Sequence, residues 1–358
     1  MFICLPILIL SSCISESISS GRSYYSSSGT YSILFCSFSR SSVYTGSGGV
    51  VYLVGTNVIV NIEDCMFYNC VAKDQGGAIV ISSSNGQQSL NRVCANMCYS
   101  TTTVCQFGKF AILKDLPNSL QMISVLNCGP QSCNQDYSIR LEKGNQEFSQ
   151  SNSSNNYCPN SPVFVSTYFA SLKFSYSTIF QNYGEDSGVN ILYPSSVQEI
   201  RFNNFAKSII SASNGRIIYT SGSLSISYSV FRENSAKYLF YVSAGTLSAT
   251  HSYLSHGSTI NKGTFETINC SALMFSTYHF YHFNSYHCFA NTYTPTASDI
   301  PLIRTQTLGS TLHPSLFPAQ TFGYTSVPSL FPTASFYPTV FISIQPIGFI
   351  LLLLFISQ

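Results

Sequence analysis

The chain has 358 residues, only 8% of which are charged, and its formal net charge at pH 7 is +2. An average soluble domain carries roughly 25% charged residues. The polar surface of this protein must therefore consist mainly of hydroxyl, amide and phenol groups. Such a surface has few ionised groups for acid–base chemistry. A near-neutral chain also lacks the clustered basic patch that is typical of nucleic-acid binding. We therefore expect no nucleic-acid partner.

Residues 1–15 are predicted to be a secretion signal. Phe2 to Leu10 is apolar apart from Pro6, and Ser-rich sequence follows. This length fits the apolar core of a signal peptide and is too short for a membrane span, although no Lys or Arg precedes the run. Leu10-Ser11-Ser12-Cys13 is also similar to the cleavage box of bacterial lipoproteins, in which Cys13 would be acylated, and that alternative stays open.

The chain contains thirteen cysteines, eleven of which remain once Cys4 and Cys13 are removed with the signal. Such cysteine content favours an oxidising compartment. The odd number predicts a free thiol or an intermolecular bridge.

Short sequences recur every 23–29 residues in a head that we place at residues 25–290. Gly48-Gly49 returns 28 residues later as Gly76-Gly77. Phe180, Phe205, Phe231 and Leu254 are spaced by 25, 26 and 23 residues and are expected at equivalent positions of successive repeats. Several repeats contain alternating apolar and polar residues, which is the signal of a half-buried strand. A short period with two or three strands per repeat predicts an all-β solenoid of stacked coils. An antiparallel sandwich is the alternative.

Two of these repeats resemble a known family. Phe67-Tyr68-Asn69-Cys70-Val71-Ala72, followed by Gly76-Gly77-Ala78-Ile79, resembles the repeat of polymorphic outer-membrane-protein adhesins, in which Phe-x-x-Asn precedes Gly-Gly-Ala-Ile. Phe231 with Asn234 matches the first half at full spacing, whereas the Asn after Phe67 comes one position early. The resemblance covers about residues 30–260. It implies a single-stranded right-handed parallel β-helix, pectin-lyase-like, of the kind found in surface proteins of parasitic protists.

Cysteine spacing leaves two arrangements open. Cys65, Cys94 and Cys128 are expected at equivalent positions of successive coils, as a buried ladder of thiols or with disulfides between coils. Disulfides Cys65–Cys70 and Cys128–Cys133 are the alternative.

Two N-glycosylation sequences are present, at Asn152-Ser153-Ser154 and Asn269-Cys270-Ser271. Residues 149–156 are predicted to form a polar loop that leaves the coil, which favours Asn152 as the acceptor over Asn269.

Beyond the head, residues 291–338 predict an extended Pro/Ser/Thr-rich stalk, because proline fixes φ and removes a backbone donor. Residues 340–356 are mostly apolar and predict a short transmembrane span. A lipid anchor attached after Thr333-Ala334-Ser335 and a buried core helix are the alternatives. We expect membrane attachment through this segment and an extracellular head at the cell surface.

No catalytic, cofactor-binding or metal-binding residue is predicted. Glycoside hydrolysis needs two convergent carboxylates, but the neighbours Glu63-Asp64 and Glu185-Asp186 point to opposite faces of a strand. The stretch His279-x2-His282-x4-His287-Cys288 offers four zinc-type ligands. Its alternation with aromatic residues favours an aromatic rung that caps the solenoid.

These observations predict a membrane-anchored cell-surface β-helix protein that is adhesin-like or makes contact with a host or the environment. Its expected partners are a host-surface protein or glycan, with self-association as a further expectation. A β-helix carbohydrate-active enzyme (polysaccharide lyase or hydrolase) and a structural surface-coat protein are the alternatives.

Overall fold

The head is described by a computed structural model. The described residues are 7–11, 14–15, 28–101, 110–114, 117–129, 137–255, 262–271, 278, 280 and 282–283. The chain divides into two units, Met1–Leu302 and Ile303–Gln358, and all described residues belong to the first. The predicted stalk and the predicted membrane segment lie outside the described residues. Within the described residues, no helix is long and apolar enough to cross a bilayer.

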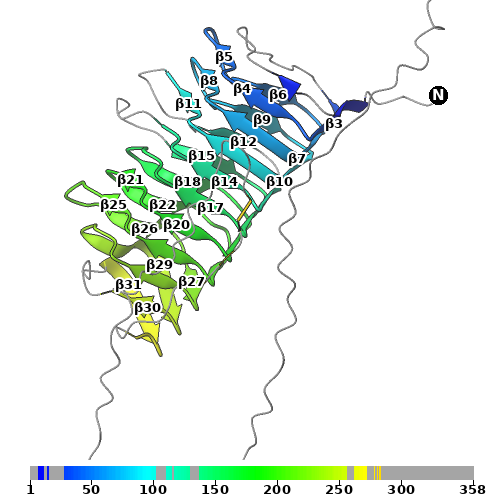
Figure 1. Ribbon diagram of the computed structural model, residues 1–358. Helices are drawn as coiled ribbons and strands as arrows, with labels where there is room; N and C mark the ends of the chain where they lie inside the picture. The colour runs from blue at the N-terminus through cyan, green and yellow to red at the C-terminus, as the bar shows by residue number, and fades with distance from the viewer. Residues whose placement is uncertain are drawn as a thin grey trace, which may run out of the picture. The chain divides into compact units, whose positions relative to one another are not determined.

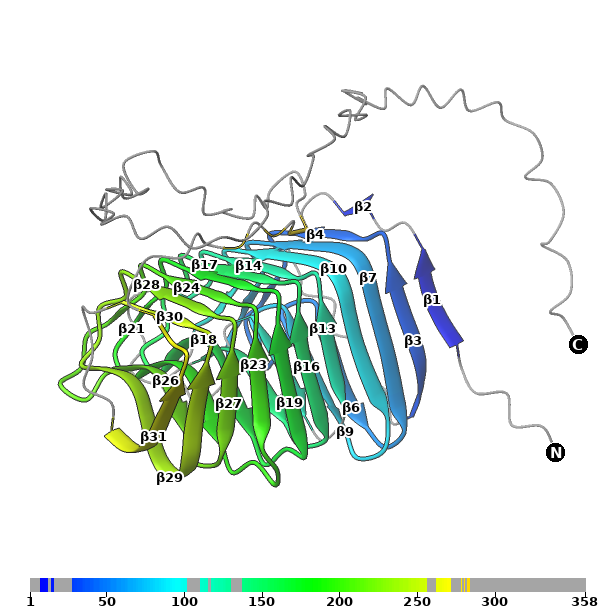
Figure 2. The same ribbon diagram turned by 90° about the horizontal axis from the view of Figure 1, so that it is seen from below.

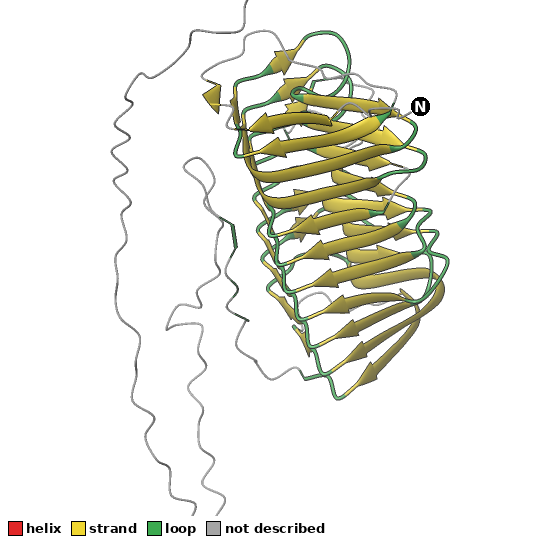
Figure 3. Cartoon of the chain, turned by 90° about the vertical axis from the view of Figure 1, so that its right-hand side faces the viewer, coloured by secondary structure: helices red, strands yellow, loops and turns green. Residues whose placement is uncertain are grey.

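The described chain winds into a right-handed parallel β-solenoid (Figure 1). Its residues form strands and turns without any helix, as the predicted all-β class requires. Every pairing between the described strands is parallel, which excludes the antiparallel sandwich. Three ladders of parallel strands enclose the core (Figures 2 and 3). We call them the A, B and C faces, and each coil contributes one rung to each face. About seven turns separate the first complete rung from the last.

Three long strands turn a corner or cross between faces, so they contribute to two ladders each. The A face contains β1 (Ile7–Ser11), β3 (Gly29–Leu34), β7 (Val58–Tyr68), β10 (Gln87–Asn96), β13 (Asn118–Gln121), β16 (Asn145–Ser149), β19 (Ser171–Ser175), β23 (Gln198–Arg201), β27 (Leu224–Ser227), β29 (Tyr238–Thr250) and β31 (Lys262–Ile268). The B face contains β2 (Ile14–Ser15), β4 (Ser37–Ser39), parts of β7 and β10, β14 (Ser124–Leu126), β17 (Asn152–Ser154), β20 (Thr178–Phe180), β24 (Asn204–Ala206), β28 (Val230–Arg232) and β30 (Tyr253–Leu254). The C face contains β6 (Val51–Gly55), β9 (Ile79–Ser83), β12 (Ala111–Lys114), β15 (Tyr137–Glu142), β18 (Ser161–Thr167), β22 (Ser187–Leu192), β26 (Arg216–Thr220) and the start of β29. Short strands lie between the B and C faces: β5 (Ser42–Val43), β8 (Val71–Ala72), β11 (Tyr99–Ser100), β21 (Tyr183–Gly184) and β25 (Ile209–Ile210).

The core consists of inward-facing side chains that stack on their equivalents in the next coil. On the B face, Phe205 pairs with Phe231, and their buried rings stack at 4.6 Å. Leu254 follows Phe231 in the same column, as the repeat spacing predicts. Phe180 was expected in this column, but Ile179 occupies the position and Phe180 is only half-buried. The alternation within β20 is therefore offset by one residue from the prediction.

Each B strand ends in a corner built by two residues with different tasks. The first residue has a left-handed backbone, as at Glu233 (φ 51°). The second points inward, as Asn234 does: its Nδ2 donates to the carbonyl oxygen of Phe205 (2.8 Å) and its Oδ1 accepts the N–H of Ser208 (3.0 Å). Both partners belong to the preceding coil. The Phe-x-x-Asn spacing thus follows from a core Phe and a corner amide that joins two coils.

Cysteines take the same corner position in the first half of the head. Cys70 Sγ lies 3.7 Å from the carbonyl oxygen of Phe38, and Cys98 Sγ lies 3.4 Å from that of Phe67. Cys70 therefore replaces the corner asparagine of the Phe67 repeat, whereas Asn69 is the left-handed residue (φ 51°). The Asn that follows Phe67 one position early is therefore not the corner residue of this repeat, because Cys70 occupies the position that Asn234 has in the Phe231 repeat.

The predicted column of Cys65, Cys94 and Cys128 is wrong. Cys65 lies at the corner between the A and B faces, Cys94 pairs with Met66 and Ser124 on the outer side of the B face, and Cys128 lies at the corner after the B face. Three different positions of the coil are involved, because a constant residue spacing does not distinguish one corner from the next.

The predicted Cys65–Cys70 bridge is not formed. Both residues are free thiols, since the B strand separates their two corners. Cys133, the predicted partner of Cys128, lies outside the described residues.

Gly76 and Gly77 form the entry to the C face, where Ala78 and Ile79 are buried. Gly76 has a positive φ of 53°, which favours glycine because a Cβ is strained there. A Cβ on Gly49, the equivalent of Gly77 one coil earlier, would overlap the carbonyl oxygen of Gly77. The Gly-Gly repeat therefore permits close contact between successive coils.

Candidate functional site

A column of exposed or half-buried aromatic side chains follows the corner between the A and B faces. It consists of Tyr176, Phe202, Tyr228 and His251, and we call it the aromatic corner. All four have a left-handed backbone, with φ between 48° and 53°, which is uncommon for bulky residues. Asp64 adopts the same backbone at the A–B corner of an earlier coil (φ 52°). The fold therefore requires this conformation, and the aromatic side chains are what distinguish this part of the corner.

The next residue of each corner fixes the aromatic residue in place. Ser177 Oγ accepts the N–H of Ser151 (3.1 Å), and Asn203 Oδ1 accepts the N–H of Ser177 (2.8 Å). These buried links turn the corner inward, so the side chain before each of them must point outward. The aromatic rings consequently rest on a rigid hydrogen-bonded column.

The four rings stack face to face at nearly the rung spacing. Centroid distances are 5.2 Å from Tyr176 to Phe202, 5.0 Å from Phe202 to Tyr228 and 5.1 Å from Tyr228 to His251. Their planes deviate by at most 12°. Because the inner ring faces are covered by one another, the column presents mainly ring edges. Tyr176 remains 46% exposed and Tyr228 38%, so the edge of this stack is available for contact.

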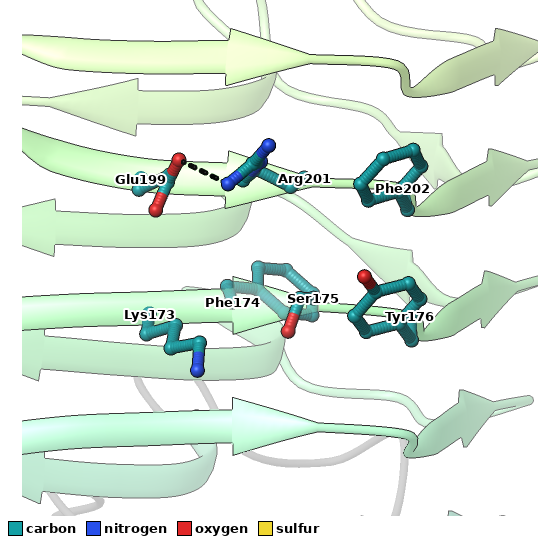
Figure 4. A pocket seen from close by; sticks show the side chains of 7 residues that line it. All are labelled: Lys173, Phe174, Ser175, Tyr176, Glu199, Arg201 and Phe202. Atoms are coloured by element: carbon teal, nitrogen blue, oxygen red, sulfur yellow. Dashed lines mark ion pairs between the residues drawn. The ribbon is translucent and has the colours of Figure 1, made fainter.

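A shallow depression of about 190 Å³ lies on the A face beside the aromatic corner (Figure 4). Glu199 and Arg201 form an ion pair at 3.3 Å along β23, on one side of the depression, and the Arg201 guanidinium lies 5.6 Å from the centre of the Phe202 ring. Lys173, one rung earlier, lies 3.9 Å from Glu147. Lys173, Glu199 and Arg201 line the depression, and Glu147 beside Lys173 brings the local charges to two of each sign.

A second depression of about 270 Å³ continues along the A face and shares Lys173 with the first. Most of its lining consists of amide and hydroxyl side chains: Gln87, Gln88, Asn118, Ser119, Asn145, Gln146 and Ser171. Such groups donate and accept hydrogen bonds without ionisation. Gln88, Asn118 and Gln146 are almost fully buried, so the neutral groups that this part of the A face presents are mainly those of Gln87, Ser119, Asn145 and Ser171.

The opposite border of the A face, where the chain arrives from the C face, also carries stacked tyrosines. Tyr168 and Tyr193 are 63% and 58% exposed, and their rings stack at 4.8 Å. Aromatic rings thus lie on both borders of the A face at the rungs of β19 and β23.

Residues of the predicted zinc-like stretch lie on the outside of the B face. Tyr278 exchanges two hydrogen bonds with the Asn204 side chain (2.8 and 3.0 Å), and its ring meets Phe202 edge to face. Phe280 meets Tyr176 in the same way. These described residues therefore cover the B face and do not form the predicted capping rung.

The same segment continues towards earlier coils. His282 Nε2 lies 2.9 Å from Thr178 Oγ1, and Ser124 Oγ donates to the carbonyl oxygen of Phe283 (2.6 Å). Burial lowers the pKa of His282. His279, His287 and Cys288 lie outside the described residues, and the described part of the chain contains no group of three or more metal-type ligands.

Carboxylates of the described head are largely neutralised by basic neighbours. The ion pairs are Glu63 and Asp64 with Arg92, Glu142 with Arg140, Glu147 with Lys173, Asp186 with Arg216, Glu199 with Arg201, and Glu233 with Lys207 and Arg232. Burial raises the pKa of Asp186, although Arg216 opposes this shift. The charged partner of Asp186 is the Arg216 guanidinium at 2.8 Å, not a second carboxylate of the kind that glycoside hydrolysis needs.

The two glycosylation candidates have opposite surroundings. Asn152 is fully buried in β17, so the predicted loop over 149–156 is wrong: its polar residues form strands whose side chains hydrogen-bond between coils. A glycan on Asn152 would not fit in this fold. Asn269 is exposed at the corner after β31.

The aromatic corner was not predicted from the sequence, although a signal for it exists. Each aromatic residue precedes a Ser or Asn, in Tyr176-Ser177, Phe202-Asn203, Tyr228-Ser229 and His251-Ser252, at intervals of 26, 26 and 23 residues. Comparisons with protein-family models, curated proteins and solved structures find no match for this chain.

Proposed function

We propose that this chain is a cell-surface contact protein, adhesin-like, whose A face binds a partner on another cell. The supporting observation is the A face itself, where a depression lined mainly by amide and hydroxyl groups adjoins a stretch of mutually paired charges that is bordered by stacked aromatic rings. Aromatic groups are enriched at binding surfaces because they bury much area and lose little entropy. A secretion signal and attachment through residues 340–356 would present this face at the cell exterior.

The partner that fits best is a neutral glycan or a weakly charged protein surface. Charged side chains of the depression are already paired with each other, so a polyanion would gain little. The predicted kinship with right-handed, pectin-lyase-like β-helices of the polymorphic outer-membrane-protein type is part of the same proposal. It accords with the solenoid and with the Phe-x-x-Asn corner at Phe231 and Asn234.

Carbohydrate-active chemistry receives less support than binding. Described carboxylates on the A face are held in ion pairs, as Glu147 is with Lys173 of the next rung and Glu199 with Arg201 of the same strand. An acid catalyst with a raised pKa beside an ionised carboxylate is not assembled by these residues. We therefore propose contact without catalysis.

Adhesion of cells that display the full chain tests this proposal. Cells that are otherwise non-adherent would express the wild-type chain, the Tyr176→Ser/Tyr228→Ser variant, or Tyr44→Ser as a matched control, and attachment to host-cell monolayers would be counted. Tyr44 is 79% exposed and lies between β5 and β6, away from the A face. We expect the double variant to lose most attachment and the control to retain it.

Salt dependence gives a second readout. Raising the ionic strength to about 1 M shortens the Debye length to about 3 Å, which weakens ionic contacts selectively. We expect attachment to persist, because the proposed contact is neutral. Equal attachment by the double variant, or loss of attachment in salt, would contradict this use of the A face.

A further inference from the structure

We propose that the heads associate end to end, with β31 of one copy pairing with β3 of the next. In this contact β31 takes the place that β1 occupies within a single chain. The inference rests on the proposed function in one respect: the segment that carries β1 must be removed as a secretion signal. It goes further by naming a second copy of this chain as a partner.

The N-terminal edge of the A face accepts an added parallel strand. β1 pairs with β3 in a regular parallel register, from Ile7 with Thr30 to Ser11 with Leu34. Beneath it, Tyr31 and Ile33 are only 6% and 3% exposed. Because β1 falls within the predicted signal, its removal would uncover the edge of β3 and these two core side chains.

The C-terminal end of the A face is open among the described residues. β31 pairs with β29 on one side, and no other described strand pairs with it. Its inward-facing residues are incompletely covered: Phe265 is half-buried against Phe240 (rings 5.3 Å apart), and Thr267 is exposed. A seven-residue edge strand of this kind offers its backbone groups to another strand. Figure 2 shows β1 and β31 at opposite ends of the head.

The two ends are complementary in direction and register. All rungs of the A face are parallel, so β31 of one copy has the direction required to precede β3 of another. Leu247 pairs with Phe265 and Ala249 with Thr267, and these columns lead through the head to Tyr31 and Ile33. At a rung spacing of about 4.8 Å, the contact places Phe265 over Tyr31 and Thr267 over Ile33.

Outward-facing residues are also compatible across this contact. The same register places Thr264 beside Thr30, Glu266 beside Ser32 and Ile268, which is 50% exposed, beside Leu34. No like charges meet, which would destabilise a cross-strand pair. Since the contact joins different ends of each copy, it repeats without closing and produces chains of heads.

Cross-linking of the mature full-length chain tests the register. The chain would be exported by a secretory host, extracted in mild detergent and treated with a short bis-maleimide after Ser32→Cys/Glu266→Cys substitution. We expect a ladder of dimers and larger species. Ser32→Cys/Ser225→Cys is the matched control, because Ser225 lies in the same outward column but within the head. A mixture of the two single variants should give dimers and nothing larger.

A charge at the end of the core column tests the contact independently. Thr267→Lys is tolerated in an isolated head, where position 267 is exposed, but it places an ammonium over Ile33 in the contact. We expect about a tenfold or greater loss of cross-linked dimer, because an unpaired charge is costly to bury. Thr264→Lys, on the outward side of β31, should change the yield little, and circular dichroism should be the same for both variants.

Several outcomes would overturn the proposal. They are a cross-linked ladder no stronger than that of the Ser225 control, an unchanged yield with Thr267→Lys, or an intact mass that retains residues 7–11 in the exported chain. Because these measurements use purified protein without host cells, they fail or succeed separately from the adhesion assay.

Discussion

Asn182 provides the sharpest test of how the coils are held together. Its Oδ1 accepts the N–H of Asn156 (3.0 Å) and its Nδ2 donates to the carbonyl oxygen of Ser153 (2.8 Å), both from the preceding coil. The side chain is fully buried. Asn182→Ala removes two hydrogen bonds worth about 1 kcal/mol each and leaves a buried N–H without its partner, which costs about 1–3 kcal/mol more. We therefore expect a loss of about 3–5 kcal/mol in the free energy of unfolding.

Asn182→Asp should behave differently, because its effect depends on pH. The ionised carboxylate accepts the Asn156 N–H but faces the Ser153 carbonyl oxygen without a donor. Burial and this contact raise the pKa of the new carboxyl in the folded state above its ordinary value of about 3.9. The protonated acid can donate to Ser153 and so imitate the amide. Stability is then greatest below pH of about 4 and falls as the pH rises, by about 1.4 kcal/mol for each unit of raised pKa.

Urea denaturation followed by circular dichroism at pH 4 and pH 7 would measure both effects. Each variant is compared with the wild-type chain at the same pH, since other carboxylates also titrate. Gln181→Gly is the control, because Gln181 has a left-handed backbone (φ 50°) in the same corner and glycine adopts it without strain. Two results would refute the role of the corner amide: Asn182→Asp being no less stable at pH 7 than at pH 4, or Asn182→Ala having the same free energy of unfolding as Gln181→Gly.

Three further predictions follow from the core, the thiols and the glycosylation sequences. Phe205→Ala removes a buried ring stacked on Phe231, and we expect it to lower the free energy of unfolding by about 3–5 kcal/mol; a urea midpoint equal to the wild type would contradict this. Burial raises the pKa of Cys65 to about 12, so iodoacetamide at pH 8 should leave Cys65 unmodified in the folded chain and alkylate it in urea, as peptide mass spectrometry would show. In a glycosylating host, Asn269→Gln should remove a glycan from the folded, secreted protein while Asn152→Gln removes none; a mass shift with Asn152→Gln alone would reverse this assignment.

Repeat spacing was sufficient to predict the solenoid but not the place of each residue within a coil. The recurrence of Phe205, Phe231 and Leu254 identified a true column, because core residues of a parallel ladder recur once per turn. The predicted column of cysteines does not exist, because Cys65 and Cys128 occupy different corners of the coil. Cys65, Cys94 and Cys128 follow one another at spacings similar to the repeat length, which suggested equivalent positions. The polar sequence of residues 149–156 predicted a loop, but its Ser and Asn side chains are buried and form hydrogen bonds between coils.

The candidate site was harder to predict than the fold. Tyr176, Phe202 and Tyr228 come from separate coils, and only the register of β19, β23 and β27 brings their rings together. An aromatic residue in a sequence usually indicates the core, and here many of them do face inward. Recognising the aromatic corner would have required knowing that each residue before the corner Ser or Asn has a left-handed backbone and points outward.

At the corners between the A and B faces, one residue links adjacent coils and the left-handed residue before it forms part of the surface. Neighbours such as Ser177 and Asn203 hold adjacent coils together, whereas the residue before each of them contributes its backbone to the turn and its side chain to the surface. Substitution at position 176, 202 or 228 therefore alters what the head presents without removing a link between coils. A protein built in this way can change its contact specificity one coil at a time while its fold remains the same.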